Sequence, residues 1–369
     1  MYLKPLQTAL VQLQHIFHPT STAQTQAQAQ EKTHNNKEEQ DESTTTVHLP
    51  QMFTLFLSGE PPVNPHYAEI RAESEKWLAE KCAFAERATR RLSKTDFSYF
   101  CSVSAPRAGR EELRTVCDWG NWVFPFDDMF DNGALRADPT RAQEVIESLL
   151  AGMGMNDPLI QVHNSVWDRI VEGSPVGTQR RFAKTMHDYC MGSLAQVQNA
   201  SKKSFPSIEE MLALRRQSAG VAPLFALVEY AHKLNIPDTV FKSKSIQEIE
   251  RIGVDFVLIQ NDILSYCKEE REGVTHNLVA IARRTGLSAQ SAFTHIGDML
   301  RARYRDWYLA LTELPSWGED VDVQVQEYIE GVRAVVRANL AWSFRSQRYF
   351  GGMGPEVRRT GVVSVKKVV

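Results

Sequence analysis

The sequence predicts an all-α, single-domain protein, and three observations lead to this fold class. Long stretches carry apolar residues at helical spacing and are rich in helix-forming residues. Alternating stretches rich in Val, Ile and Thr, which are typical of strands, are scarce. Gly and Pro lie mostly between the helical stretches, as at Glu60-Pro61-Pro62 and Gly351-Gly352. The chain is therefore expected to fold as packed helices without a sheet.

Four stretches are predicted as helices, namely 67–91, 207–217, 248–270 and 323–349. The second begins with a capping box, in which Ser207 caps the helix and Glu210 reaches back to the amide of Ser207. The last carries an apolar stripe that runs from Tyr328 to Leu340. The sequence Ser218-Ala219-Gly220 is expected to end the helix that begins at Ser207.

The N-terminal part of the chain differs in composition from the rest. Residues 21–46 consist mostly of Gln, Thr, Ala, Glu, Asn and Lys and contain no aromatic residue. Such a stretch buries too little apolar surface to offset its chain entropy. We therefore expect a disordered, low-complexity extension over residues 1–46, one helical domain over 47–352 and a C-terminal tail over 353–369.

Charge and hydropathy exclude several classes of partner. The 42 Lys and Arg and 45 Asp and Glu residues give a formal net charge of −3, which offers no general attraction for nucleic acid or anionic membranes. No stretch approaches the roughly 20 apolar residues of a membrane span, and no signal peptide is recognised. The five cysteines are odd in number and show no CxxC spacing, which favours reduced thiols in the cytoplasm. Nothing in the sequence fixes the oligomeric state.

The first site-like feature is a group of carboxylates after an aromatic stretch. Asp127 and Asp131 are four residues apart and share one helix face, with Asp128 beside them. Close carboxylates repel one another, and beside aromatic surface the cost rises unless a cation neutralises them. Oxygen ligands of this kind suit Mg²⁺, which is usually shared with a phosphate. The alternative is a solvated acidic helix end.

The second feature is a polar column on the helix predicted over 248–270. Asn261, Ser265 and Glu269 follow each other at intervals of four residues and supply an amide oxygen, a hydroxyl and a carboxylate. Lys268 could reach an anion bound to the same ion. The alternative is an exposed polar helix face. Because the two features lie 134 residues apart on different helices, they could face each other across a bundle and clamp a metal–diphosphate group.

Together the two motifs resemble those of class I terpene synthases, specifically the fungal sesquiterpene synthases of the basidiomycete type. The stretch from Phe126 to Asp131 resembles the aspartate-rich motif, and the stretch from Asn261 to Glu269 resembles the NSE motif. Arg348-Tyr349 resembles the Arg-Tyr pair of the family, and Arg215 its diphosphate-sensing arginine. The resemblance covers roughly residues 49–352 and implies a helical bundle around a central active-site cavity.

The resemblance further implies farnesyl diphosphate as the substrate and three Mg²⁺ ions as cofactors. Metal ligands would be Asp127, Asp128, Asp131, Asn261, Ser265 and Glu269, of which Asp127, Asn261, Ser265 and Glu269 are also expected to be catalytic together with Arg215. The diphosphate would be bound by Arg215, Lys268, Arg348 and Tyr349. The alternative for Arg215 and Arg216 is a solvated helix face that carries both, and only one of the two can point into the site.

The cation that forms when diphosphate leaves requires a dry cavity with aromatic walls. The candidate aromatic residues are Tyr99, Phe100, Trp122, Phe124 and Trp342, each of which could equally be plain core. Phe124 and Trp342 are preferred because they share helices with site residues.

Two other functions remain open from the residues alone. A chain-elongating prenyltransferase of the same fold is disfavoured, because that class carries a second aspartate-rich motif where this chain has Asn, Ser and Glu. A non-catalytic helical binding protein is disfavoured, because such a protein has no need for two sets of oxygen ligands.

Overall fold

The structure, a computed structural model, describes residues 43–131, 133–152, 157–200 and 206–367, so most of the expected disordered extension lies outside it. The helices are α3 (Tyr67–Lys81), α4 (Glu86–Thr95), α5 (Phe97–Ser104), α6 (Arg110–Asp131), α7 (Pro139–Leu150), α8 (Pro158–Gly173), α9 (Val176–Ala200), α10 (Ile208–Ser218), α11 (Ala222–Ala231), α12 (Asp238–Phe241), α13 (Lys244–Glu272), α14 (Leu278–Arg284), α15 (Ala289–Thr312), α16 (Glu319–Arg345), α17 (Gln347–Phe350) and α18 (Gly354–Thr360). Short 3₁₀ turns are η1 (Leu55–Leu57) and η2 (Gly351–Met353), and the strands are β1 (Thr44–His48) and β2 (Val362–Lys366).

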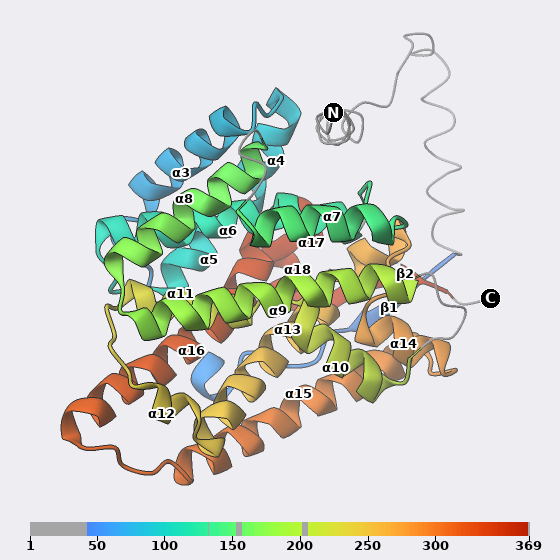
Figure 1. The fold of residues 1–369 in the computed structure, drawn as a ribbon. Coiled ribbons are helices and arrows are strands. Elements are labelled where there is room, and N and C mark those ends of the chain that lie inside the picture. The colour runs from blue at the N-terminus through green and yellow to red at the C-terminus, as the bar shows by residue number, and fades with distance from the viewer. Residues whose placement is uncertain (1–42, 132, 153–156, 201–205, 368–369) are drawn as a thin grey trace.

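The long helices pack into one bundle, as the all-α prediction requires (Figure 1). Helix α13 packs against α10, α15 and α16, while α6 packs against α3, α5, α8 and α9. The apolar side of α13 includes Ile249, Ile252, Phe256 and Ile263, which are at most 1% exposed and recur at helical spacing. Burial of such a stripe fixes α13 at the centre of the bundle, between the helices that bear the other site residues.

Two predicted helices are confirmed with small changes of length. The helix predicted over 248–270 is α13, and the helix predicted over 207–217 is α10. Both hydrogen bonds of the capping box are present, because Glu210 N donates to Ser207 Oγ (3.2 Å) and Ser207 N donates to Glu210 Oε2 (2.7 Å). As expected, α10 ends at Ser218, and Gly220 adopts a positive φ of +65°.

The prediction of one continuous helix over 67–91 is wrong. Helix α3 ends at Lys81, where the amide of Phe84 donates to the carbonyl of Ala79 and Ala83 adopts a left-handed φ of 47°. This is the hydrogen-bond pattern of a Schellman cap. It lets the ring of Phe84 pack against the core instead of following the helix into solvent.

The helix predicted over 323–349 is also divided. Helix α16 ends at Arg345, and the next residue, Ser346, has an extended backbone. The side-chain hydroxyl of Ser346 accepts a hydrogen bond from Arg348 N (3.1 Å). Ser346 therefore caps the short helix α17. This break places Arg348 and Tyr349 on a separate turn that faces the centre of the bundle.

The expectation of no sheet is wrong in one respect. Strands β1 and β2 pair antiparallel, in register from Thr44 opposite Lys366 to His48 opposite Val362. The segments 44–46 and 354–366 lie outside the predicted domain limits of 47 and 352, yet they form β1, α18 and β2. Val47, Val363 and Val365 of this sheet are buried, so apolar burial fastens the two ends of the described chain to the bundle.

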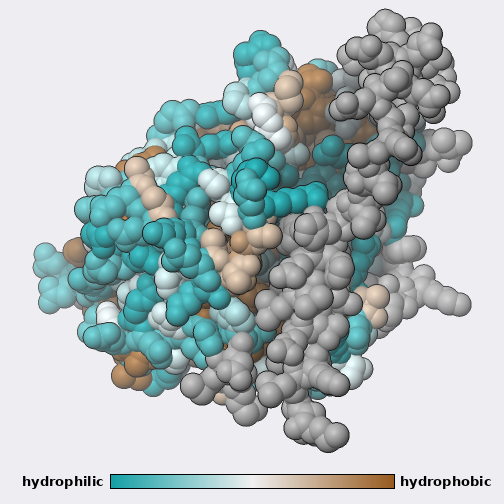
Figure 2. Space-filling view, turned by 90° about the horizontal axis from the view of Figure 1, so that it is seen from above, coloured by the Kyte–Doolittle hydropathy of each residue, from teal (hydrophilic) through white to brown (hydrophobic). Residues whose placement is uncertain are grey.

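The molecular surface is predominantly polar. Seen from above, the visible face is mostly hydrophilic, with hydrophobic residues in small separate groups (Figure 2). None of the helices in the described ranges combines the length and the apolar character needed to cross a membrane.

Candidate active site

A cavity between α6, α9, α10, α13 and α16 brings the two predicted motifs together. It encloses about 960 Å³ of empty space, including space open to solvent. Its polar lining comprises Asp127, Asp131, Gln196, Arg215, Ser218, Asn261, Lys268, Glu269, His276, Asn339 and Arg348. Its apolar and aromatic lining includes Phe97, Phe100, Trp119, Val123, Phe124, Tyr189, Leu224, Val257, Trp342 and Tyr349. The cavity therefore joins carboxylates and basic side chains to a set of aromatic rings.

One wall of the cavity is the C-terminal end of α6. The side chains of Asp127 and Asp131 line the cavity from this end. Each is held by a residue of α9, since the hydroxyl of Tyr189 donates to Asp127 (2.9 Å) and Nε2 of Gln196 donates to Asp131 (2.5 Å). The two carboxylates are thus fixed in orientation by a neighbouring helix.

These carboxylates are poised to accept positive charge. Burial, followed by the charges of Asp131 and Asp128, raises the pKa of Asp127 to about 8. Burial and the charge of Glu269 on the facing wall also raise the pKa of Asp131. A divalent cation would relieve this repulsion, so the donor set fits a metal.

Asp128 has a different environment from its neighbours. Its carboxylate is paired with Arg348 (2.8 Å) and Arg91 (3.1 Å), and it is not part of the cavity lining. Burial opposes ionisation, but the charges of Arg348 and Arg91 outweigh it and lower the pKa of Asp128. In this structure Asp128 holds Arg348 rather than facing the carboxylates of the cavity.

The facing wall is formed by the column on α13. Asn261 accepts a hydrogen bond from Arg215 (2.9 Å) and donates one to the hydroxyl of Tyr349 (2.7 Å). Glu269 accepts a hydrogen bond from Asn277 (2.8 Å), and burial followed by the charge of Asp262 raises its pKa. Asn261 and Glu269 both line the cavity.

Ser265 lies between these two residues on the same face of α13. It is fully buried and, unlike Asn261 and Glu269, it is not part of the cavity lining. Its hydroxyl lies by the carboxylate of Glu269 and partly offsets the rise in pKa that burial causes in that group. The expectation that Ser265 binds an ion together with Asn261 and Glu269 therefore stays a prediction.

Of the two adjacent arginines, Arg215 is the one that reaches the cavity. Its Nε and Nη2 donate to Asp262 (3.0 and 2.7 Å), and its Nη2 also donates to Asn261. Arg216 instead donates to the buried Asp255 (2.6 and 2.9 Å) and lies outside the cavity lining. The choice between them by resemblance agrees with this geometry.

The other predicted diphosphate-binding residues also line the cavity. Arg348 lies over the ring of Phe124 at 4.4 Å, and Lys268 is paired with Glu272 (2.7 Å). Tyr349 packs edge-on against Trp342, with ring centroids 5.5 Å apart. Arginine and lysine from α10, α13 and α17 therefore surround the mouth that holds the carboxylates.

Three of the five candidate aromatic residues line the cavity. Phe124 and Trp342 stack at 5.4 Å, and Phe100 lies beside them. The candidates Tyr99 and Trp122 are not part of the lining. Trp122 donates to the carbonyl of Leu159 (2.9 Å) and packs in the core, while the ring of Tyr99 lies under the guanidinium of Arg345.

The oxygen donors are divided between two walls. Within the part of the chain that the structure describes, no three His, Cys, Asp or Glu side chains are already grouped as a closed metal site. Mg²⁺ typically takes one or two carboxylates and completes its shell with water and substrate phosphate. This coordination preference is consistent with oxygen ligands that come from two walls, namely Asp127 and Asp131 on one and Asn261, Ser265 and Glu269 on the other.

The residues that hydrogen-bond to the site side chains and orient them were not predicted from the sequence. Tyr189 and Gln196 are seven residues apart, which places them two turns apart on one face of α9, but no pattern selected that helix. Asp262, inside the NSE motif, accepts from Arg215 and from the amide of Leu278 (2.7 Å). The sequence held a signal for Asp262, because it follows Asn261 directly. On a helix, a carboxylate next to a site residue points to a different side and can hold a residue of an adjacent helix.

Comparisons with known proteins show the family to which this chain is related. Residues 118–306 match the model of terpene synthase family 2, C-terminal metal binding. Silphinene synthase peniA of Penicillium patulum is 38% identical over 87% of this chain and 90% of its own length. The (+)-eremophilene synthase of Gibberella fujikuroi is 35% identical, over 87% of this chain and 93% of its own. Sesquiterpene synthase 3 of Postia placenta is 32% identical over 83% and 85%.

The fold is also that of solved terpene synthases. The structure of α-eudesmol synthase superposes with a TM-score of 0.71 at 21% identity, and covers 80% of this chain and 99% of its own. A linalool/nerolidol synthase from Streptomyces clavuligerus, solved with 2-fluorogeranyl diphosphate, gives a TM-score of 0.68 at 22% identity over 80% of this chain and all of its own. The chain belongs to the terpene synthase family, and its fold is the class I helical bundle that the resemblance implies. It is a terpene cyclase, a lyase that acts on a diphosphate.

Proposed function

We propose that this terpene synthase is a sesquiterpene cyclase that ionises farnesyl diphosphate and cyclises the resulting cation. The observation that carries the proposal is a single cavity with two oxygen-bearing walls at its mouth and an aromatic interior. The relatives named as silphinene, eremophilene and sesquiterpene synthases support the sesquiterpene assignment.

The diphosphate would bind at the mouth of the cavity. Arg215 and Arg348 offer planar guanidinium groups for bidentate contacts, and Lys268 and Tyr349 add single donors. Asp262 and Asp128 hold the two arginines in place, so these donors are positioned before substrate arrives. Preorganised positive charge of this kind stabilises the charge that grows on the leaving diphosphate.

Metal would be held by the two walls, by Asp127 and Asp131 on α6 and by Asn261, Ser265 and Glu269 on α13. We propose Mg²⁺, with the three ions that the resemblance implies, and the family's metal-binding domain supports a metal there. When bound, Mg²⁺ supplies Lewis-acid stabilisation of the departing diphosphate. Asp128 would contribute indirectly by orienting Arg348.

The interior of the cavity would protect the hydrocarbon cation. Phe97, Phe124 and Trp342 form one aromatic wall, and a desolvated cation over such a face gains about 2 kcal/mol or more. Exclusion of water lets the cation cyclise before it is quenched.

The five cysteines are free, which supports the cytoplasmic location expected from the sequence.

The experiment is incubation of the purified protein with farnesyl diphosphate and MgCl₂, with analysis of the headspace by gas chromatography and mass spectrometry. We expect a cyclic C15 hydrocarbon or alcohol, and no product when EDTA is present. The variants Asp127→Ala and Asn261→Ala should lose at least about 100-fold in activity while circular dichroism shows unchanged helix content.

Other outcomes would overturn the proposal in distinguishable ways. A longer prenyl diphosphate would identify a chain-elongating prenyltransferase, and no turnover of C10, C15 or C20 diphosphates would identify a non-catalytic protein. A cyclic product from C20 diphosphate alone would keep the cyclase and reject the sesquiterpene assignment. Full activity in Asp127→Ala would contradict the role of the aspartate wall.

A further inference from the structure

A buried carboxylate that the proposed mechanism does not use lies behind the aromatic wall of the cavity. Asp96 joins α4 to α5, is 6% exposed, and is not part of the cavity lining. Its backbone is left-handed, with φ 48° and ψ 49°, a conformation that L residues seldom adopt and that Asp tolerates better than most. Such a conformation persists where the surrounding structure fixes it.

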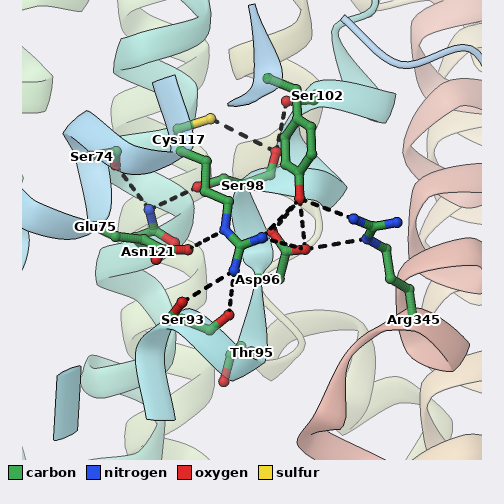
Figure 3. Close-up of polar contacts among 12 residues, drawn as sticks. Ser74, Glu75, Ser93, Thr95, Asp96, Ser98, Ser102, Cys117, Asn121 and Arg345 are labelled. Atoms are coloured by element: carbon green, nitrogen blue, oxygen red, sulfur yellow. Dashed lines mark hydrogen bonds and ion pairs between the residues drawn. The ribbon is translucent and has the colours of Figure 1, made fainter. Parts of the chain in front are cut away.

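Three side chains from two other helices fix this carboxylate. Oδ2 of Asp96 accepts a hydrogen bond from the hydroxyl of Tyr67 (2.7 Å) and is paired with Nη1 of Arg71 (3.3 Å). The same oxygen accepts a hydrogen bond from Nε of Arg345 (3.2 Å), which approaches from the opposite side (Figure 3). Tyr67 and Arg71 belong to α3 and Arg345 belongs to α16, so Asp96 joins helices nearly 280 residues apart along the chain.

The residues on either side of Asp96 shape the cavity. The carbonyl of Thr95 accepts a hydrogen bond from Nε1 of Trp342 (2.7 Å). The ring of Phe97 stands edge-on to Trp342 and to Phe124, with centroids 5.2 and 4.6 Å apart. All three rings line the cavity, so any movement of the α4–α5 junction moves the aromatic wall.

Helix α16 is fastened to this junction at two points on the same turn. Trp342 and Arg345 are three residues apart, which places them on one side of the helix. The Thr95–Trp342 hydrogen bond fixes the indole ring, and the Asp96–Arg345 pair fixes the backbone that carries it. Loss of the second contact removes the ion pair that sets the position of α16 at this junction, while the packing of Trp342 against Phe97 remains.

We propose that Asp96 is a positioning residue that determines the product distribution of this enzyme. It acts through Phe97 and Trp342 and has no contact with the carboxylates of the site. The product of a cyclisation depends on which carbons the cation presents to one another, and the cavity wall decides this. The inference rests on the proposed function, because it requires a cation inside the cavity.

The decisive measurement is the ratio of products, because a ratio does not depend on how much of the enzyme is folded. Asp96→Asn keeps a residue that tolerates the left-handed backbone but removes the charge that pairs with Arg71 and Arg345. Arg345→Gln leaves Asp96 with Tyr67 and Arg71 and removes the contacts that the guanidinium on α16 makes with Asp96, Tyr67 and the ring of Tyr99. With farnesyl diphosphate and MgCl₂, we expect both variants to raise the share of side products about threefold, since small differences between competing barriers suffice.

A matched control is available in another buried carboxylate. Glu229 is fully buried and accepts hydrogen bonds from Arg181 (2.9 Å) and Thr178 (2.8 Å), but it does not line the cavity. Glu229→Gln should lower the melting temperature as Asp96→Asn does, with an unchanged product ratio.

The product ratios of the three variants test whether Asp96 acts on the product distribution. Unchanged product ratios in Asp96→Asn and Arg345→Gln would reduce Asp96 to a purely structural role, and if Asp96→Asn fails to fold, Arg345→Gln alone decides. An equal shift in Glu229→Gln would show a general effect of destabilisation and would also overturn the inference. Absence of any terpene from the wild-type enzyme would reject the proposed function and this inference with it.

Discussion

The hydroxyl of Tyr189 donates a hydrogen bond of 2.9 Å to the carboxylate of Asp127, so a residue of α9 sets the orientation of the leading aspartate on α6. The ring of Tyr189 packs near Phe126, with ring centroids 6.1 Å apart, which holds the side chain in place. This contact fixes Asp127 before any metal arrives.

We therefore expect Tyr189→Phe to weaken metal binding more than it weakens folding. A hydrogen bond to a charged group contributes about 1.5–3 kcal/mol, so the Mg²⁺ concentration for half-maximal activity should rise about tenfold. Titration of Mn²⁺ by electron paramagnetic resonance gives the same quantity without turnover. The matched control is Tyr230→Phe, whose hydroxyl donates to Thr115 (3.1 Å) away from the cavity. Equal metal affinity in the two variants would contradict this role.

The two adjacent arginines offer a second comparison. Arg215→Lys keeps a charge but cannot reproduce the forked contacts to Asp262 and Asn261, so kcat/KM should fall about 100-fold. The inhibition constant of inorganic diphosphate should rise with it. Arg216→Lys disturbs a forked contact of the same kind on Asp255 and should cost stability only. If both variants bind diphosphate as the wild type does, Arg215 is not its sensor.

The ring of Trp342 is expected to influence the product. Trp342→Phe removes the hydrogen bond to Thr95 and weakens the cation–π interaction, so the share of the main product should change by at least about twofold. Trp307→Phe is the control, because Trp307 is equally buried but packs against Phe56, outside the cavity. Identical chromatograms for wild type and Trp342→Phe would return Trp342 to the ordinary core.

A buried glutamate predicts a pH dependence of stability. Burial raises the pKa of Glu250 from 4.5 to about 7, although the hydroxyl of Tyr328 donates to it. The folded state therefore retains a proton that the unfolded state has lost, and stability falls as the pH rises from about 4.5 to about 7. Glu250→Gln should remove this loss, about 3 kcal/mol at pH 8. Urea unfolding of the wild type and of Glu250→Gln at pH 5 and at pH 8 measures the free energy of unfolding of each. An equal change between the two pH values in both proteins would contradict the raised pKa of Glu250.

Much of the site was predictable because helix geometry is local. The four-residue spacing of Asp127 and Asp131, and of Asn261, Ser265 and Glu269, fixes which side chains share a face, whatever the rest of the chain does. The capping box at Ser207 and Glu210 is local for the same reason. That the two motifs, 134 residues apart on different helices, could face each other was inferred from their placement, and the resemblance to a family then turned this possibility into an expectation.

Local sequence patterns are enough to predict the set of helical faces and the chemistry that each face carries. The partner that each side chain finds depends on how the whole bundle packs, because partners come from distant elements whose packing no local pattern encodes. Asp128 turns to Arg348 and Arg91, Asp127 is held by Tyr189, and helix α16 stops at Arg345 so that Tyr349 can reach Asn261. The two terminal strands escaped prediction for the same reason, since neither strand is stable until the other lies beside it.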